Sequence, residues 1–120
     1  MKETTLNQFL TSRFLNLRDN TIIIDNSERL DFRNIQNGVL IVYASWSGQS
    51  VISVPRSIQL LYDQNYSGQI LVVDNDCMTP DFQIKKLGRV CHGWGEVFVV
   101  HNGQIVNKYL GKESFTKFPF

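Results

Sequence analysis

The sequence predicts an α/β fold with a mainly parallel central sheet that helices cover on both faces. Runs of apolar and β-branched residues at 21–25, 39–44 and 70–74 are typical of buried strands. Segments with helical spacing or helix-capping residues lie between these runs. Two further strand-like runs, 97–100 and 104–110, flank Asn102-Gly103, which predicts a hairpin. Strands that alternate with helices favour a parallel sheet, and the hairpin adds antiparallel strands at one edge.

The first 20 residues predict an amphipathic helix over 5–17, which Thr4 or Thr5 could cap. Its apolar positions are Leu6, Phe9, Leu10, Phe14 and Leu17. We interpret the segment as an extra helix that packs on the domain, and a partner-binding helix is the alternative.

The later helices carry clear boundary signals. A short helical segment is expected from Asn26 or Ser27 through Ile35, followed by a turn at 36–38. Residues 47–62 predict a helix that Pro55 kinks, with Gly68 as its expected terminator. Its apolar stripe is Val51, Val54, Ile58 and Leu61. Residues 79–88 predict a helix capped by Thr79 and stopped by Gly88.

Composition limits the function classes. The chain has 120 residues, 42% of them hydrophobic and 19% charged, which suits one globular domain. A formal charge of +1 with no Lys/Arg run gives no reason to expect a nucleic-acid or membrane partner. The start of the chain lacks a signal-peptide-like apolar run, and there are two cysteines, so a cytoplasmic protein is expected.

The stretch "ASWSGQS" at 44–50 follows a buried strand and opens the helix that contains Pro55. In that setting Trp46 and Gly48, and the distance of five residues from Ser50 to Pro55, resemble the Trp-Cys-Gly-Pro-Cys turn of the thioredoxin family. Asn102-Gly103 and Gly111 resemble that family's hairpin and its following glycine. The resemblance covers about residues 21–112. It implies one thioredoxin-like domain over 1–120: a central mixed sheet flanked by helices, with residues 1–20 as a helical extension.

The departures from the family pattern fall on its chemistry. Ser47 and Ser50 occupy the two cysteine positions, and Gln49 replaces the proline between them. Ile41 stands at the position of the family's buried acid, and Gly95 at that of its cis-proline. Disulfide exchange needs a thiolate and a second sulfur, and a serine hydroxyl supplies neither. No catalytic, cofactor or metal residue is therefore assigned.

Ser47 has other possible roles. Helix capping is the simplest, because serine is among the best N-cap residues. In a catalytic pair, His92 would be the base: it would have to lie within reach of the Ser47 hydroxyl, and a third group would have to orient it. A glutathione-related enzyme using Ser47 is a further alternative, because glutathione transferases resemble this fold, but they also rely on the cis-proline and a helical second domain.

Cys77 and Cys91 are interpreted as free, buried small hydrophobes. A regulatory or catalytic cysteine pair, or an enzyme using Cys91, is the alternative. A metal site with Asp76 and His92 lacks a recognisable ligand spacing. Asp76 and its neighbour Asp74 are more simply explained as polar residues at a strand end.

The resulting functional hypothesis is a redox-inert, protein-binding module with a chaperone, adaptor or immunity-type role. The alternatives are a thiol-dependent or glutathione-related enzyme, and an oxidoreductase in which two cysteines were mutated to serine. The changes at Ile41 and Gly95 argue against the mutant. The predicted contact surface consists of Trp46, Ser47, Gly48, Gln49, Ser50, His92, Trp94, Gly95 and Glu96.

Overall fold

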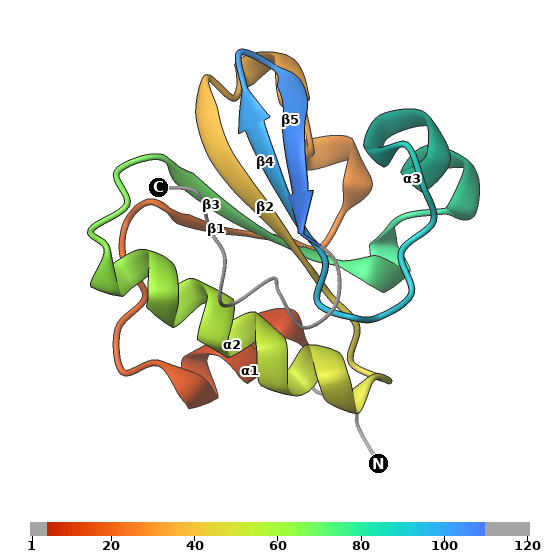
Figure 1. Ribbon diagram of the computed structural model, residues 1–120. Coiled ribbons are helices and arrows are strands. Elements are labelled where there is room, and N and C mark those ends of the chain that lie inside the picture. The colour runs from red at the N-terminus through yellow and green to blue at the C-terminus, as the bar shows by residue number, and fades with distance from the viewer. Residues whose placement is uncertain (1–4, 110–120) are drawn as a thin grey trace.

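The computed structural model, which describes residues 5–109, is built on one five-stranded mixed sheet (Figure 1). The strands are β1 Thr21–Ile24, β2 Asn37–Tyr43, β3 Gln69–Asp74, β4 Val97–His101 and β5 Gln104–Tyr109. Their order in the sheet is β1-β3-β2-β4-β5. β3 pairs in parallel with both β1 and β2, whereas β4 is antiparallel to β2 and β5. The predicted α/β architecture, with its parallel centre and its closing hairpin, is confirmed.

Helices cover both faces of this sheet. α1 (Leu6–Arg13) and α2 (Gly48–Asp63) pack on one face, and α3 (Pro80–Leu87) packs on the other (Figure 1). Short 3-10 turns η1 (Ser27–Arg29), η2 (Phe32–Asn34) and η3 (Asn75–Cys77) complete the second layer. No helix in the described part of the chain is long and apolar enough to cross a membrane.

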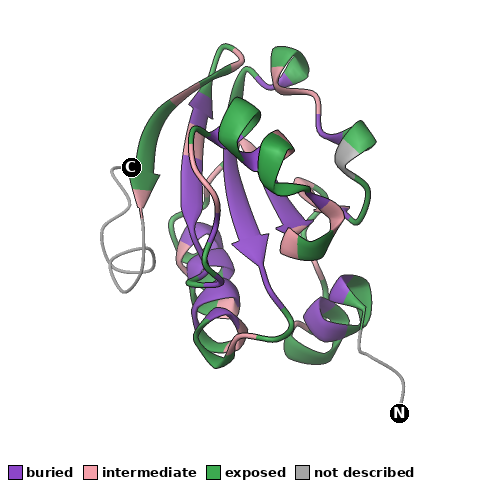
Figure 2. Cartoon of the chain, turned by 90° about the vertical axis from the view of Figure 1, so that its right-hand side faces the viewer, coloured by how far each residue is buried: buried purple, intermediate pink, exposed green. Residues whose placement is uncertain are grey.

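Two hydrophobic cores lie on opposite sides of the sheet (Figure 2). Along β2, Val39, Ile41 and Tyr43 enter the core beneath α1 and α2, whereas Leu40 and Val42 enter the core on the α3 side. Successive side chains of a strand point to opposite faces, so a central strand covered on both sides is apolar at every position. This explains the unbroken apolar run that predicted β2.

The N-terminal helix is shorter than the sequence pattern predicts. Thr5 forms a capping box with Gln8, but α1 ends at Arg13 and Phe14 adopts an extended backbone. The hydroxyls of Thr11 and Ser12 donate to carbonyls of their own helix, a geometry that weakens a helix end. Phe14 and Leu17 follow the helix and still pack against the core. The regular spacing of apolar residues therefore marks buried side chains and continues past the end of α1. Thr4, the other proposed cap, lies outside the described residues.

The predicted extent of α2 is confirmed, but its predicted terminator was wrong, as were the predicted helical segment and turn before β2. α2 spans Gly48–Asp63, and the chain reverses at Asn65, with φ 54°, rather than at Gly68. Asparagine adopts the left-handed region more readily than other non-glycine residues, so it can end a helix where no glycine is present. The expected helical segment from Asn26 to Ile35 consists instead of η1 and η2, with Asp31 capping η2. β2 already begins at Asn37, so most of the predicted 36–38 turn belongs to the strand.

Other predicted elements are confirmed closely. Thr79 caps α3 by accepting the Phe82 N–H, and Gly88 ends it at φ 80°. Asn102 and Gly103 connect β4 to β5, both with positive φ, as a tight hairpin turn requires. In α2, Pro55 lies inside the helix, and the predicted stripe faces the core. Gly111, which was also matched to the family pattern, lies outside the described residues.

Candidate functional site

The turn at 46–50 connects the end of β2 to the start of α2. Ser47 is the N-cap of α2, and its Oγ accepts the Ser50 N–H at 3.4 Å and donates to the carbonyl of Gly93. Ser50 is fully buried, and its Oγ accepts the Ala44 N–H at 2.8 Å. Ser47 therefore caps α2, which agrees with the capping interpretation, and Ser50 satisfies a backbone N–H that precedes the turn.

The loop 92–96 packs tightly against this turn. A Cβ on Gly93 would lie 2.7 Å from the indole of Trp46, and one on Gly95 would collide with Ser53 Oγ. Both glycines also have positive φ, 76° and 75°. Ser53 Oγ donates to the Trp94 carbonyl at 3.2 Å. The two glycines thus allow the loop to approach α2 at a distance that a side chain would prevent.

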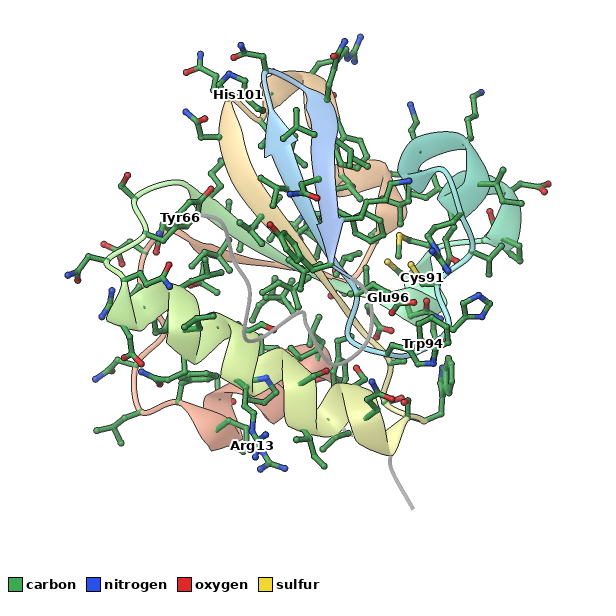
Figure 3. All side chains as sticks on the ribbon, viewed as in Figure 1. Arg13, Tyr66, Cys91, Trp94, Glu96 and His101 are labelled. Carbon is green, nitrogen blue, oxygen red and sulfur yellow. The ribbon has the colours of Figure 1, made fainter. Side chains whose placement is uncertain are left out.

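Glu96 is completely buried beneath the same loop. Its two carboxylate oxygens accept the backbone N–H groups of His92, at 2.6 Å, and of Trp94, at 3.1 Å. Figure 3 shows its carboxylate near Trp94 and Cys91, at the end of the molecule away from His101. The side chain therefore anchors the loop from inside, and it does not reach the surface where the sequence analysis expected it to contact a partner.

The predicted contact residues divide into an exposed set and a buried set. Trp46 is 59% exposed and Trp94 is 39% exposed. Gly48, Gln49 and His92 are also exposed, whereas Ser47 is intermediate. Ser50, Gly95 and Glu96 are buried, so they shape this surface from below.

The two tryptophans are held in different ways. Trp46 Nε1 donates to Asp76 Oδ1 at 3.0 Å, and the other end of its ring lies over Gly93. Trp94 packs beside His92, with 4.8 Å between the ring centroids. From the sequence, Asp76 was interpreted as a polar residue at a strand end, and no sequence signal pointed to its bond with Trp46, because thirty residues separate the two.

The geometry does not favour a nucleophilic serine. The hydroxyl of Ser47 donates to the Gly93 carbonyl, whereas the imidazole of His92 is exposed and packs beside Trp94. A general base must accept the proton of the nucleophile, and here the Ser47 hydroxyl directs its proton to a backbone carbonyl instead of to the imidazole. At the position of the family's buried acid, Ile41 is fully buried in the apolar core.

Both cysteines are free, and neither lies in the turn at 46–50. Burial, with a smaller contribution from the Glu96 carboxylate, raises the pKa of Cys91 to about 12. Burial, with the nearby carboxylates of Asp74 and Asp25, raises the pKa of Cys77 to about 11. Thiols with such pKa values remain protonated at neutral pH and are poor nucleophiles. Among residues 5–109, no group of three or more His, Cys, Asp or Glu side chains could hold a metal ion.

Comparison with known proteins supports the fold but not a specific activity. No protein-family model matches the chain, and no curated protein matches it in sequence. Among solved structures, oxidised thioredoxin O2 from Arabidopsis thaliana has a TM-score of 0.65 and 15% identity, covering 82% of this chain and 89% of that one. The reduced thioredoxin pre-protein of Schistosoma mansoni has a TM-score of 0.59 and 17% identity, covering 78% and 88%.

Oxidised mitochondrial thioredoxin 3 from Saccharomyces cerevisiae has a TM-score of 0.58 and 20% identity, with coverage of 76% and 83%. At these identities the likeness concerns the fold alone. The chain has a thioredoxin-like fold, and its function must be argued from its own residues.

Proposed function

We propose that this chain is a redox-inert, thioredoxin-like module that binds a protein partner. The observation that carries the proposal is the use of both serine hydroxyls at the head of α2. Ser47 caps the helix and binds the Gly93 carbonyl, and buried Ser50 binds the Ala44 N–H. A site built on these oxygens has no sulfur with which to attack or to resolve a disulfide.

The exposed part of the site suits protein recognition. Trp46 and Trp94 expose large amphipathic rings; the Trp46 ring is held by its hydrogen bond to Asp76, and the Trp94 ring packs beside His92. Rigid aromatic side chains contribute strongly to interfaces because little conformational entropy is lost when they bind. A chaperone, adaptor or immunity-type role is compatible with such a surface, and a reducing compartment such as the cytoplasm suits two free thiols.

The redox part of the proposal is tested by insulin reduction in the presence of dithiothreitol. The unmodified chain is expected to give the rate of dithiothreitol alone. The matched variant S47C/S50C places two thiols at the head of one helix, and is expected to form an intramolecular disulfide. Its reductase activity should stay below that of a thioredoxin, because Ile41 and Gly95 are unchanged. Rapid insulin reduction by the unmodified chain would refute redox inertness.

The binding part is tested by affinity capture from the native host. The double variant W46A/W94A is expected to lose partners that the unmodified chain retains. Ile84→Ala is the matched control, because Ile84 is an apolar side chain that is 54% exposed on α3. Equal capture by the unmodified chain and by W46A/W94A would show that this surface is not the binding site.

A further inference from the structure

A glutamine occupies a core position on α3. Gln83 is 3% exposed, and with Leu87, one turn further on, it forms the buried face of this helix. Apolar side chains normally fill such positions, because an amide removed from water is costly unless it forms hydrogen bonds. The hydrogen bonds of Gln83 explain its burial, and they lead to two segments of the candidate site.

The side-chain oxygen of Gln83 holds the start of the loop that carries Trp94. The N–H of Cys91, a residue that is itself buried, donates to Gln83 Oε1 at 2.8 Å. The N–H groups of His92 and Trp94 donate to the buried carboxylate of Glu96. Two buried side chains thus fix the backbone of this loop from inside the domain.

The side-chain nitrogen of Gln83 holds the turn at the end of β3. Gln83 Nε2 donates to Asn75 Oδ1 at 3.2 Å, with a longer contact of 3.5 Å to the Met78 carbonyl. Asn75 begins η3, and Met78 follows it. Within η3, Asp76 accepts the indole N–H of Trp46 at 3.0 Å. The Trp46 ring is therefore held by a turn that Gln83 holds in place.

Glutamine has the two hydrogen-bonding groups that this position requires. The backbone N–H of Cys91 can only donate and the carbonyl of Met78 can only accept, so the side chain between them must offer an acceptor and a donor. An ionised glutamate would lack the donor, and an apolar side chain would lack both groups. Without the amide, the buried N–H of Cys91 would lose its partner.

We propose that Gln83 is a positioning residue for the protein-binding surface, and that it fixes Trp46 and Trp94 relative to each other from beneath that surface. This inference rests on the proposed function and adds to it a residue on which the geometry of the surface depends. The two tryptophans lie on separate segments of the chain. A partner that contacts both binds more tightly when both rings are already in place, because less conformational freedom is lost in the complex.

The test follows the indole N–H signals of Trp46 and Trp94 in proton–nitrogen correlation spectra, in which the variants W46F and W94F assign them. Gln83→Leu removes both bonds of the amide, so both indole signals are expected to shift. The backbone N–H of Cys91 is expected to exchange with solvent about tenfold faster, because it loses its acceptor. Unchanged indole signals in folded Gln83→Leu would overturn the inference.

Asn75→Ala is the second variant, because it removes the Gln83 bond to η3 and leaves the bond to Cys91 intact. Asn75 is half-buried, so this variant should fold even if Gln83→Leu does not. It is expected to shift the Trp46 signal and to spare that of Trp94. An unshifted Trp46 signal would overturn the inference, because the hold on η3 would then not reach the ring.

Leu87→Ala is the matched control, because Leu87 is buried on the same face of α3. It should destabilise the domain, as the loss of a buried leucine does, without shifting either indole signal. Equal shifts in Leu87→Ala and Gln83→Leu would mean that lost stability alone moves the rings, and would overturn the inference.

Affinity capture separates this inference from the proposed function. Gln83→Leu is expected to retain less of the host partners than Leu87→Ala does. If Gln83→Leu shifts both indole signals but retains the partners that W46A/W94A loses, Gln83 does not position the binding surface, and the protein-binding proposal stands. If W46A/W94A retains those partners, the proposed function fails, and this inference fails with it.

Discussion

At the scale of single residues, Glu96 illustrates how the surface at 92–96 is built. From the sequence we expected this glutamate on the surface, since charged residues are rarely fully buried. The structure buries it because two backbone N–H groups of its own loop supply hydrogen bonds to its carboxylate. These hydrogen bonds depend on the path of the backbone from His92 to Glu96, which the positive φ angles of Gly93 and Gly95 allow. The hydrophobic periodicity of the sequence does not indicate that path.

The variant Glu96→Gln tests the anchoring role. A carboxamide has only one accepting oxygen, so the N–H of His92 or of Trp94 would lose its partner and face an NH₂ group. We expect a loss of about 1–3 kcal/mol in the free energy of unfolding, measured in urea by circular dichroism. Glu28→Gln, at an exposed position in η1, is the control and should change little. Unchanged stability of Glu96→Gln would mean that the loop does not depend on this carboxylate.

The two cysteines give a prediction on pH. Their thiols have pKa values raised from 9.0 to about 11 for Cys77 and about 12 for Cys91. The folded state therefore holds protons that the unfolded state releases above pH 9.0, so their contribution to stability is intact below that pH. It should decline as pH rises from there through the folded pKa values.

A chromogenic disulfide should accordingly label the folded chain slowly at neutral pH, with a rate that rises only in strongly alkaline solution. In denaturant both thiols should react as ordinary cysteines. Fast labelling of one thiol in the folded chain at neutral pH would restore the hypothesis of a reactive cysteine.

At the scale of elements, the sequence predicted best where boundary signals are local. α3 is defined by Thr79, Pro80 and Gly88, all within ten residues, and the structure confirms its limits. The length of α1 was overestimated because the apolar spacing continues through Phe14 and Leu17, which pack against the core from the segment that follows the helix. Periodicity reports which side chains are buried, and it does not distinguish a helix from a chain that passes over the same core.

Alanine substitutions at two glycines test whether the left-handed backbone of Gly88 ends α3. Gly88 ends α3 at φ 80°, and a Cβ there would also lie 3.0 Å from Lys108 Nζ. Gly88→Ala is expected to lower the free energy of unfolding by about 1 kcal/mol. Gly48→Ala is the control, because Gly48 starts α2 without positive φ and with open space around its Cβ position. It should be neutral or slightly stabilising, and equal destabilisation by both changes would contradict the left-handed cap.

At the scale of the whole molecule, the sheet separates two cores, and α1 belongs to one of them. The sequence suggested a docked extra helix and left a partner-binding helix as the alternative. Leu6, Phe9 and Leu10 are buried, and the ring of Phe9 stacks on that of Tyr43 at 4.5 Å. Tyr43 ends β2 just before the turn at 46–50, so α1 supports the strand that leads into the candidate site. The apolar face of α1 is thus occupied by the domain itself.

If α1 is part of the core, truncating its central side chain must destabilise the whole domain. Leu10 is fully buried, and Leu10→Ala should cost about 2–5 kcal/mol of unfolding free energy. Leu15→Ala is the control, because Leu15 is 100% exposed just after the helix. Urea unfolding followed by circular dichroism and by tryptophan fluorescence should give coincident transitions, both shifted by Leu10→Ala and neither by Leu15→Ala. Trp46 and Trp94 lie in the loops at 44–50 and 92–96, so a fluorescence transition unmoved by Leu10→Ala would show that α1 unfolds independently of the site.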